Sequence, residues 1–356
     1  MRRLLLINPG STSTKIASYE DEREAAAASI EHAAAELAPF PRIADQAPLR
    51  LAAIRSFLAG NGLALAGLAA VVARGGLLRP ISGGTYRVGE AMLADLAAAR
   101  WGEHASNLGA ILAHGLAAEA GCPACIVDPV VVDELADIAR FSGMPDIPRR
   151  SIFHALNQKS VAREVAARLG RPYGDCRFIV AHLGGGISVG AHAGGRVIDV
   201  NNALDGDGPF SPERSGGVPA GQLIDLCFSG KHTQAAMRRR VTGQGGLVAY
   251  RGTNRFTEVA AAARAGDAEA ALLCDAMAYQ VAQEIAKHGA TLEGRVDRII
   301  LTGGMANDQD LTGRISRRVS FLAPVEVVPG EREMLSLARG FLAVADGREP
   351  LLEYGS

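Results

Sequence analysis

The chain has 356 residues, of which 48% are hydrophobic and 21% are charged, and its formal net charge at pH 7 is −1. This composition is ordinary for a globular protein and excludes the disordered, collagen-like and coiled-coil classes. Nucleic-acid binding is disfavoured, because such proteins usually carry a basic excess that neutralises phosphates. We therefore expect a small-molecule partner and, at roughly 150 residues per domain, two or three domains.

The N-terminal apolar run is short. Only residues 4–7 are apolar before Asn8, which is too few for the core of a signal peptide. The longest uncharged apolar stretch, residues 62–73, is roughly twelve residues long, whereas about twenty are needed to span a bilayer. We therefore expect a cytoplasmic protein without a membrane segment. Cys122 and Cys125 lack the further ligands of a zinc site, so we expect structural thiols.

Short apolar runs alternate with Ala-rich amphipathic stretches along the chain. This alternation predicts an α/β fold. The N-terminal run, residues 5–13, resembles residues 179–187 at an offset of 174. In each copy the apolar residues end near a polar side chain, Asn8 or His182, and a turn of small residues leads into a second strand-like run. Two hairpin openings half a chain apart predict two related domains.

The second half of the chain contains further predicted elements. Residues 187–200 predict two strands joined by a glycine turn, and residues 267–288 predict a helix. Residues 298–305 predict a buried strand that ends at Gly303 and Gly304. These glycines would let a nucleoside lie flat on the backbone, or they simply cap the strand.

Both small-residue turns have the composition of a phosphate site. Gly, Ser and Thr leave backbone N–H groups to point at an anion, and glycine lets that anion approach closely. Two such turns facing each other would hold a polyphosphate, whereas each alone could be an ordinary hairpin turn. The P-loop class has no support, because no segment reads Gly-x-x-x-x-Gly-Lys-Ser/Thr. The glycines near Gly184 do not fit a dinucleotide-binding turn either.

Four motifs, in order along nearly the whole chain, resemble those of the acetokinase family. They are the N-terminal signature at 8–15, the second phosphate motif at 182–186, the key-arginine segment at 212–216 and the adenosine motif at 301–304. The resemblance implies two similar actin-like (ribonuclease-H-like) domains around an ATP cleft. It also implies direct in-line transfer of the γ-phosphoryl group of ATP to a short-chain carboxylate, which yields ADP and an acyl phosphate.

Within the family, three segments resemble the branch that acts on butyrate: residues 73–81, 201–210 and 330–334. Acetate kinases are similar but longer, with His in place of Arg74. We therefore expect butyrate as the acceptor, with acetate, propionate or a branched-chain acid as alternatives. A non-catalytic ATP-binding protein is the third alternative, because a fold does not fix a function.

The resemblance also implies a domain division and an assembly. Residues 1–128 and 331–356 would form the first domain, with the N-terminal phosphate turn and the substrate side. Residues 129–330 would form the second, with the other phosphate turn and the adenosine motif. We expect a homodimer or a higher homo-oligomer on the same basis.

Several site residues follow from the matched motifs. A carboxylate nucleophile is already ionised at pH 7, so the site must supply positive charge and hydrogen-bond donors, not a general base. Arg214 is the expected catalytic arginine, because a guanidinium can bridge carboxylate and phosphoryl oxygens. His182 would donate to the phosphoryl group, or it merely closes the hairpin. Arg74 and His154 would bind substrate, although His154 could equally be a partly buried histidine at a helix start.

The expected cofactors are ATP/ADP and Mg²⁺. Asp128 and Glu333 match acids associated with metal and phosphate, and Mg²⁺ needs only one or two carboxylates. Glu333 has a second explanation, since an acid in a first helical turn is favoured by the helix dipole. Asn8, Asp128 and Glu333 join the catalytic set, and Arg214 also belongs to the substrate-binding set. The nucleotide-binding set is Asn8, Ser11, Ser13, His182, Gly184, Gly185, Gly186, Gly303 and Gly304.

The chain departs from the family pattern after residues 252–254. The family usually continues with an acid that helps to position the key arginine, whereas this chain has Arg255. Either the geometry around Arg214 differs, or Asp207 or Glu258 takes over this role. Lys15 is left out of the catalytic set, because it could equally be a solvated strand residue.

Overall fold

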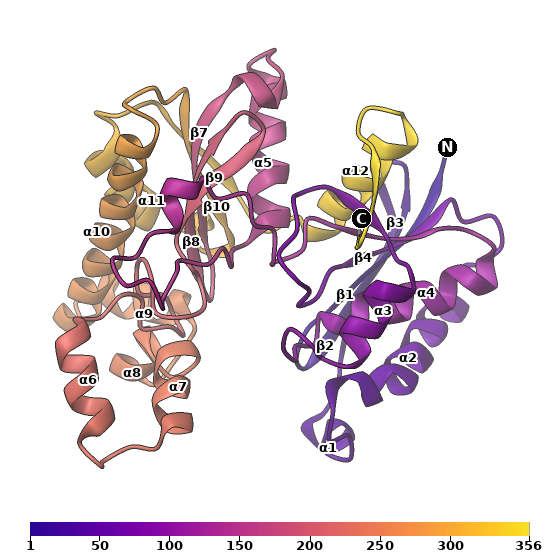
Figure 1. The fold of residues 1–356 in the computed structure, drawn as a ribbon, viewed down its shortest axis with the longest axis horizontal. Helices are drawn as coiled ribbons and strands as arrows, with labels where there is room; N and C mark the ends of the chain where they lie inside the picture. Colours follow the sequence, from indigo (N-terminus) through magenta and orange to yellow (C-terminus); the bar gives the residue numbers. More distant parts are fainter. Residues whose placement is uncertain (356) are drawn as a thin grey trace. The chain divides into compact units, whose positions relative to one another are not determined.

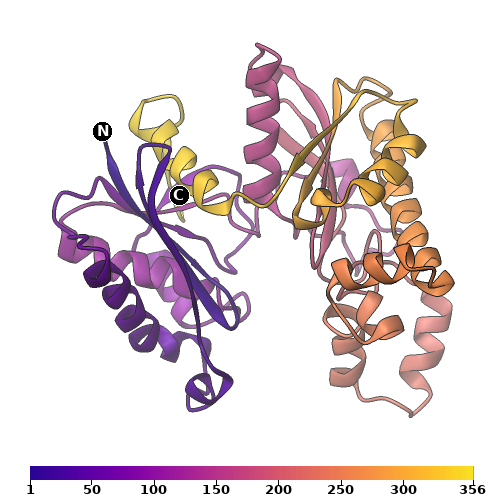
Figure 2. The same ribbon diagram turned by 180° about the vertical axis from the view of Figure 1, so that it is seen from behind.

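The computed structural model describes residues 1–355, which form two compact units. The first unit comprises Met1–Val132 and the C-terminal segment that begins at Arg332, and the second comprises Asp133–Glu331. Each unit is built on one mixed β-sheet with helices packed against it (Figure 1 and Figure 2). The α/β class predicted from the sequence is therefore confirmed.

The first unit holds a seven-stranded sheet in the order β12-β5-β6-β4-β1-β2-β3. Helices α4 and α12 pack against the central strands. This cover explains why the apolar run of β1, residues 4–7, is buried without alternation. The strands are β1 (Arg3–Pro9), β2 (Ser13–Glu20), β3 (Arg23–Glu31), β4 (Ala70–Arg74), β5 (Thr85–Arg87), β6 (Ala124–Val127) and β12 (Leu351–Glu353). The helices are α1 (Ala34–Leu37), α2 (Ala47–Gly60), α3 (Glu90–Ala97), α4 (Asn107–Ala120) and α12 (Glu333–Ala345).

The second unit holds a five-stranded sheet in the order β11-β10-β7-β8-β9. One face packs on a large core shared with α9, α10 and α11, and the other packs on α5. The strands are β7 (Arg177–Leu183), β8 (Ile187–Ala193), β9 (Arg196–Val200), β10 (Arg298–Gly303) and β11 (Val325–Pro329). The helices are α5 (Ala155–Arg168), α6 (Ala220–Phe228), α7 (Gln234–Thr242), α8 (Gly246–Arg251), α9 (Phe256–Arg264), α10 (Ala268–Thr291) and α11 (Gln309–Val319).

The two sheets repeat one topology, as the sequence predicted. Adding 174 to the bounds of β1 gives 177–183, which are the bounds of β7. In both sheets this strand forms an antiparallel hairpin with the next one and pairs in parallel with a later strand, β4 or β10. The repeat places Asn8 and His182 at equivalent positions near the carboxyl ends of their strands.

Local sequence signals explain the element ends in the second unit. Asp267 caps α10, because its side chain accepts a hydrogen bond from the backbone N–H of Ala270 at 3.0 Å. Asp308 caps α11 in the same way through Leu311. The predicted helix at 267–288 and the strand ending near Gly303 are confirmed.

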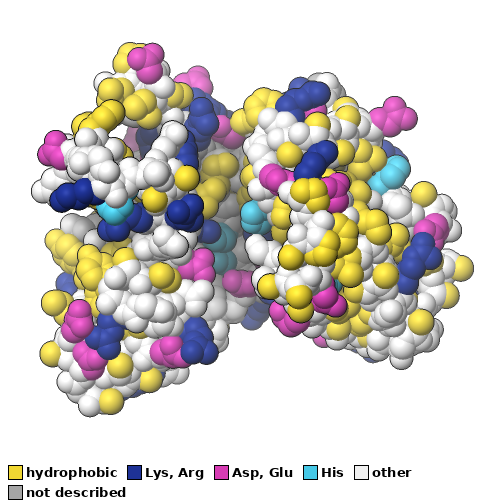
Figure 3. Space-filling model, turned by 90° about the horizontal axis from the view of Figure 1, so that it is seen from below, with side chains coloured by type: hydrophobic (Ala, Val, Ile, Leu, Met, Phe, Trp, Pro, Cys, Tyr) yellow, Lys and Arg dark blue, Asp and Glu magenta, His cyan; other side chains and the backbone are white. Residues whose placement is uncertain are grey.

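On the face shown in Figure 3, basic and acidic side chains are interspersed with apolar ones. Neither sign of charge forms a continuous field over either unit on that face, in keeping with the net charge of −1. Among the described residues, no helix combines the length and the apolar character that crossing a membrane requires.

Candidate active site

Polar side chains gather at one edge of the first sheet. β1, β4 and β6 are parallel, so their carboxyl ends meet at this edge. Asn8 lies near the end of β1, Arg74 ends β4, and Asp128 follows β6. Glu333, the first residue of α12, joins them through two hydrogen bonds. Its Oε1 accepts from Arg74 Nη1 at 2.7 Å, and its Oε2 accepts from the Asn8 amide.

Lys15 belongs to this group, which sequence reasoning missed. Its Nζ lies 3.7 Å from Glu333 Oε2. The Glu333 side chain is 14% exposed and is surrounded by one guanidinium, one ammonium and one amide. The carboxylate therefore fixes the positions of three donor side chains at the sheet edge. A sequence signal was available, because Lys15 ends the N-terminal motif at 8–15, and the hairpin register places it opposite Asn8.

Two backbone positions beside these acids adopt the left-handed region. Asp128 has φ 37° and Arg332, which directly precedes Glu333, has φ 42°. Residues other than glycine rarely adopt such angles, and strain of this kind clusters at functional sites. Asp128 is 2% exposed, and its Oδ1 accepts from the backbone N–H of Gly84 at 2.7 Å. The strained backbone thus holds a buried carboxylate at the edge where β6 ends.

The first small-residue turn, residues 10–13, is held by hydrogen bonds from Arg50 of α2. This fully buried guanidinium donates to the backbone oxygens of Ser11 and Ser13, at 3.2 and 2.8 Å. The backbone oxygen of Thr12 accepts from His32 N, and that of Ser13 also accepts from Gly10 N. All three carbonyls are thus hydrogen-bonded within the first unit, which fixes the backbone of a turn whose N–H groups are candidate donors to an anion.

Arg50 is a buried cation without a carboxylate partner among the described residues. Its remaining hydrogen bonds go to Thr14 Oγ1 at 3.0 Å and to Gln46 Oε1 at 2.9 Å. Burial lowers the pKa of the Arg50 guanidinium from its ordinary value. The positive charge behind the turn is thus balanced by dipoles alone, and an anion bound at the turn would complete the balance.

The second small-residue turn, Gly184–Gly186, connects β7 to β8. A Cβ at Gly186 would collide with Arg214 Nη1, so the glycine is required by the close approach of the arginine. Gly303, with φ 92°, packs so closely on the Leu183 backbone that it admits no side chain either, whereas a Cβ at Gly304 would meet open space. The second turn and the end of β10 therefore lack side chains, as expected for phosphate and nucleoside contacts.

Arg214 lies partly buried in the loop between β9 and α6. Its Nη1 donates to the Ala203 oxygen, and its buried Nε–H has no hydrogen-bond partner among the described residues. Burial lowers the pKa of Arg214, and the charge of Glu213 opposes this shift. An orphaned guanidinium N–H of this kind is a donor that lacks an anion. A loop rich in Pro, Gly and Ser would by itself leave an arginine exposed, but here the guanidinium packs on the Gly186 turn.

The carboxylates expected to position Arg214 do not contact it. Asp207 accepts from the backbone N–H groups of Asn202 and Gly208, at 3.0 and 2.9 Å. Glu258 accepts from the Thr253 hydroxyl at 2.8 Å and pairs with Arg255. Of the two alternatives, a transfer of this role to Asp207 or Glu258 is therefore not supported, which leaves a different geometry around Arg214.

Glu213 is the carboxylate next to Arg214. It connects the arginine loop to the segment around Asn254, where the chain departs from the family pattern. Its Oε1 accepts from the side-chain amide of Asn254 at 2.7 Å. Asn254 is one residue before Arg255, where the family usually has its acid. The segment therefore still reaches the arginine loop, but through an amide and a neighbouring carboxylate.

The two predicted histidines lie together. His182 is 3% exposed, and its ring stacks on that of His154 with centroids 3.8 Å apart and planes inclined by 8°. His154 occupies the N-cap position of α5, as its alternative interpretation predicted. His182 Nδ1 contacts Asn157 Oδ1 at 2.7 Å, and His154 Nδ1 contacts Ser188 Oγ at 2.8 Å. Asn157 was missed from the sequence, as was Ser188.

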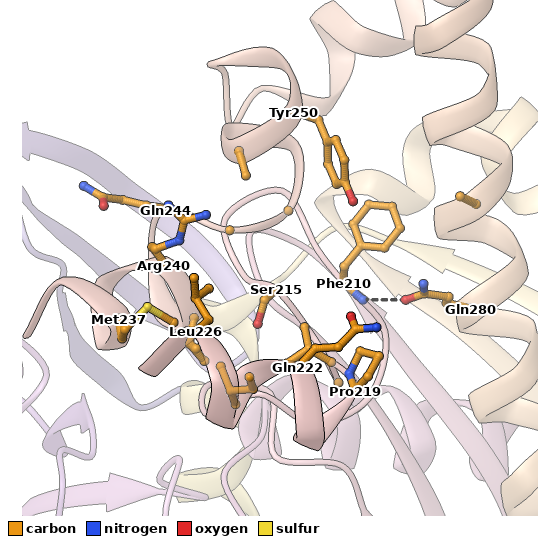
Figure 4. A pocket seen from close by; sticks show the side chains of 18 of the residues that line it. Phe210, Ser215, Pro219, Gln222, Leu226, Met237, Arg240, Gln244, Tyr250 and Gln280 are labelled. Carbon is orange, nitrogen blue, oxygen red and sulfur yellow. Dashed lines mark hydrogen bonds between the residues drawn. The ribbon is translucent and has the colours of Figure 1, made fainter. Parts of the chain in front are cut away.

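An open pocket of about 650 Å³ lies on the other side of the arginine loop (Figure 4). Phe210 and Ser215 of the loop line it, together with helices α6, α7, α8 and α10. Gln280 of α10 accepts from the backbone N–H of Phe210 at 3.0 Å, and the Tyr250 ring packs beside the Phe210 ring. These contacts anchor the loop to the helical layer.

Comparison with known proteins gives the family. A sequence model of the acetokinase family matches residues 146–324. Butyrate kinase 2 of Clostridium acetobutylicum is 53% identical over 352 residues, which cover 99% of each chain. Butyrate kinase 1 of the same organism is 52% identical over 354 residues, which cover 99% of this chain and 100% of the relative.

The fold has a counterpart among solved structures. The acetate kinase of Porphyromonas gingivalis superposes with a TM-score of 0.79 and covers 97% of this chain and 100% of its own. At 18% identity this similarity shows the fold alone. The acetate-kinase-like, actin-like architecture expected from the motifs is confirmed.

Proposed function

The chain belongs to the acetokinase family, and we propose that it is a butyrate kinase, which transfers the γ-phosphoryl group of ATP to butyrate. The observation that carries this proposal is the 52–53% identity to two butyrate kinases over nearly the full length of every chain. The products are butyryl phosphate and ADP. One butyrate oxygen bonds to the γ-phosphorus, and the bond from that phosphorus to the β–γ bridging oxygen breaks.

Phosphate binding is assigned to the two turns. The N–H groups around Ser11 and Ser13, in a turn whose carbonyls are bound by the Arg50 guanidinium, suit one part of the triphosphate. The Gly184–Gly186 turn, with Arg214 beside it, suits another. Gly303 and Gly304 offer bare backbone to the nucleoside.

The transfer step joins two anions, so cationic donors carry it. Arg214 has a buried, unpartnered Nε–H that a phosphoryl or carboxylate oxygen would satisfy. His182 donates to the transferring group from the adjacent strand end. Neither residue needs to take a proton from the nucleophile, because butyrate is already ionised at pH 7.

Arg74 is assigned to the substrate carboxylate. Among the described residues it donates from Nη1 alone, to Glu333, which leaves its other N–H groups for butyrate. Asn8 and Lys15, held by the same carboxylate, add donors beside it. Glu333 therefore orients these three side chains without occupying every N–H donor that they carry. His154 completes the substrate-side set.

Mg²⁺ fits the acids of the first unit. Asp128 and Glu333 supply the hard oxygen donors that this ion takes, with phosphate oxygens and waters as its remaining ligands. When bound, the ion neutralises charge that develops on the β- and γ-phosphates.

The test is ADP release with ATP, Mg²⁺ and straight or branched acids of two to five carbons, with hydroxylamine trapping of the acyl phosphate. We expect the highest kcat/KM with butyrate. A higher kcat/KM with acetate, propionate or a branched acid would identify that acid as the acceptor in place of butyrate. ATP binding without transfer to any acid would refute the whole proposal.

Arg214→Ala probes the transfer mechanism. We expect kcat to fall by about 10³-fold or more, the size associated with a transition-state arginine. Arg255→Ala is the matched control, because the Arg255 side chain is 72% exposed in the same unit and, in the described part of the chain, forms an ion pair with Glu258 alone. Unchanged activity in Arg214→Ala would refute the role assigned to this arginine.

A further inference from the structure

The stacked histidines are embedded in a hydrogen-bond network that fixes where each carries its proton. A neutral histidine ring has one N–H donor and one acceptor nitrogen, and its partners decide which is which. His182 and His154 each contact a side chain through Nδ1. The orientation of each partner can be read from backbone groups, whose donor and acceptor roles do not change.

For His182 the reference groups are two backbone carbonyls. Asn157 Nδ2 donates to the carbonyl oxygen of Glu331 at 2.9 Å and lies 3.4 Å from that of Gly330. Only the NH₂ end of the amide can satisfy carbonyls, so the Oδ1 end must face His182. Oδ1 accepts hydrogen bonds and cannot donate them. His182 Nδ1 therefore bears a proton, and in the neutral ring Nε2 bears none.

For His154 the reference group is the carbonyl of Ser188. Gln158 Nε2 donates to this carbonyl at 3.0 Å and to Ser188 Oγ at 2.8 Å. Ser188 Oγ also accepts from the backbone N–H of His154 at 3.4 Å. With both acceptor positions used, the hydroxyl donates its own proton to His154 Nδ1. The neutral His154 ring therefore carries its proton on Nε2, opposite to His182.

The far end of the network agrees with this assignment. Gln158 Oε1 contacts His192 Nε2 at 3.0 Å, and His192 Nδ1 contacts the Tyr173 hydroxyl at 2.8 Å. Full burial lowers the pKa of His192 well below its ordinary value, chiefly by desolvation. A neutral His192 that donates from Nε2 and accepts at Nδ1 satisfies every member of the chain.

We propose that Asn157 is a positioning residue, which makes His182 a phosphoryl donor only in its protonated, imidazolium form. This proposal rests on the butyrate kinase function above. His182 Nε2 faces Gly184 of the phosphate turn, since a Cβ there would lie 3.0 Å from it. A neutral His182 would present a lone pair to the phosphoryl oxygens and repel them, whereas the imidazolium donates and adds positive charge. His154, fixed as a donor at Nε2, needs no such charge.

The surroundings of His182 allow one cation in the stack. The titratable neighbour on the α5 side is His154, and two protonated rings at 3.8 Å would repel each other. The Gly184–Gly186 turn brings Arg214 and, beside Gly185, Glu213. β8 and β10 place Ser188 and Thr302 opposite His182 in register. Further along α5, Lys159 is paired with Glu134 at 2.7 Å.

The proton positions can be read by ¹⁵N NMR of the full chain labelled at histidine, with His182→Gln and His154→Gln to assign the signals. In neutral rings we expect a protonated Nδ1 for His182 and a protonated Nε2 for His154. With a non-hydrolysable ATP analogue, Mg²⁺ and butyrate, both nitrogens of His182 become protonated while His154 keeps its pattern. A proton on Nε2 of neutral His182 would overturn the assignment, whatever the activity.

Variants separate positioning from folding. Asn157→Leu should lower kcat by roughly 10- to 100-fold, as for residues that orient a functional histidine, with KM for ATP changed less than about twofold. Asn157→Asp restores the acceptor with a charge, so it should recover most of kcat and move the alkaline fall in kcat to higher pH. Asn61→Leu is the control, since among the described residues that amide donates to Phe57 O alone, at the end of α2.

These readouts distinguish failure of this inference from failure of the function. Transfer to butyrate with an unchanged kcat and pH profile in Asn157→Leu would overturn the positioning role and leave the kinase assignment standing. The NMR pattern, measured without turnover, would stand even if no acid were phosphorylated.

Discussion

Arg50→Met tests whether a buried cation holds the first phosphate turn. In the variant Thr14 Oγ1 keeps its contact with His32, so the buried acceptor left bare is Gln46 Oε1. A bare buried acceptor costs about 1–3 kcal/mol. The weakened support of the turn adds about 1 kcal/mol after relief from burying a charge. We therefore expect the free energy of unfolding to fall by about 2–4 kcal/mol.

The assay is urea unfolding together with steady-state kinetics. Arg55→Met is the matched control, because Arg55 lies on the same helix, is 52% exposed and pairs with Glu119 at the surface. We expect the control to change stability by less than about 1 kcal/mol. In Arg50→Met the KM for ATP should rise by about tenfold, since the backbone of the turn loses its hydrogen bonds from the guanidinium. Stability and KM equal to those of the control would refute the role of Arg50.

Two further predictions concern the second turn and the C-terminal segment. Gly186→Ala should lower kcat by about 10²-fold, because a Cβ displaces Arg214, whereas Gly174→Ala, which meets open space, should not; equal kinetics in both would contradict the packing argument. The pKa of Asp95 lies below its ordinary value, chiefly because the Tyr354 hydroxyl donates to it at 2.8 Å. A lowered carboxyl pKa stabilises the fold above the unfolded pKa of about 4 and not below the folded one. Asp95→Asn should therefore lower the urea midpoint at pH 7, and the difference from the parent should shrink toward pH 3. A difference in midpoint that does not change with pH would refute this role of the Asp95 carboxylate.

The local patterns predicted the fold well. The hairpin repeat at an offset of 174 depends on strand alternation and turn residues. Both are local signals, found in the sequence within a few residues of each element. Arg50 was missed because an arginine on a helix normally indicates a solvated face. Ile54 follows Arg50 by four residues and Phe57 follows it by seven, a spacing that places Arg50 on the buried stripe of α2, and this signal was available in the sequence.

The geometry around Arg214 could not be predicted for a different reason. Its burial depends on Gly186 and Ala203, which reach it through tertiary packing. Asp207 and Glu258 have the right charge, but local N–H and hydroxyl donors within five residues already satisfy them. Short-range hydrogen bonds of this kind compete with any longer-range role.

The most direct test of the kinase assignment follows oxygen from butyrate labelled with ¹⁸O in its carboxylate, with ATP and Mg²⁺, by ³¹P NMR. Attack of a carboxylate oxygen on the γ-phosphorus predicts butyryl phosphate with one ¹⁸O bonded to phosphorus, together with unlabelled ADP. Label in AMP, or phosphate release without labelled butyryl phosphate, would contradict direct transfer to the carboxylate.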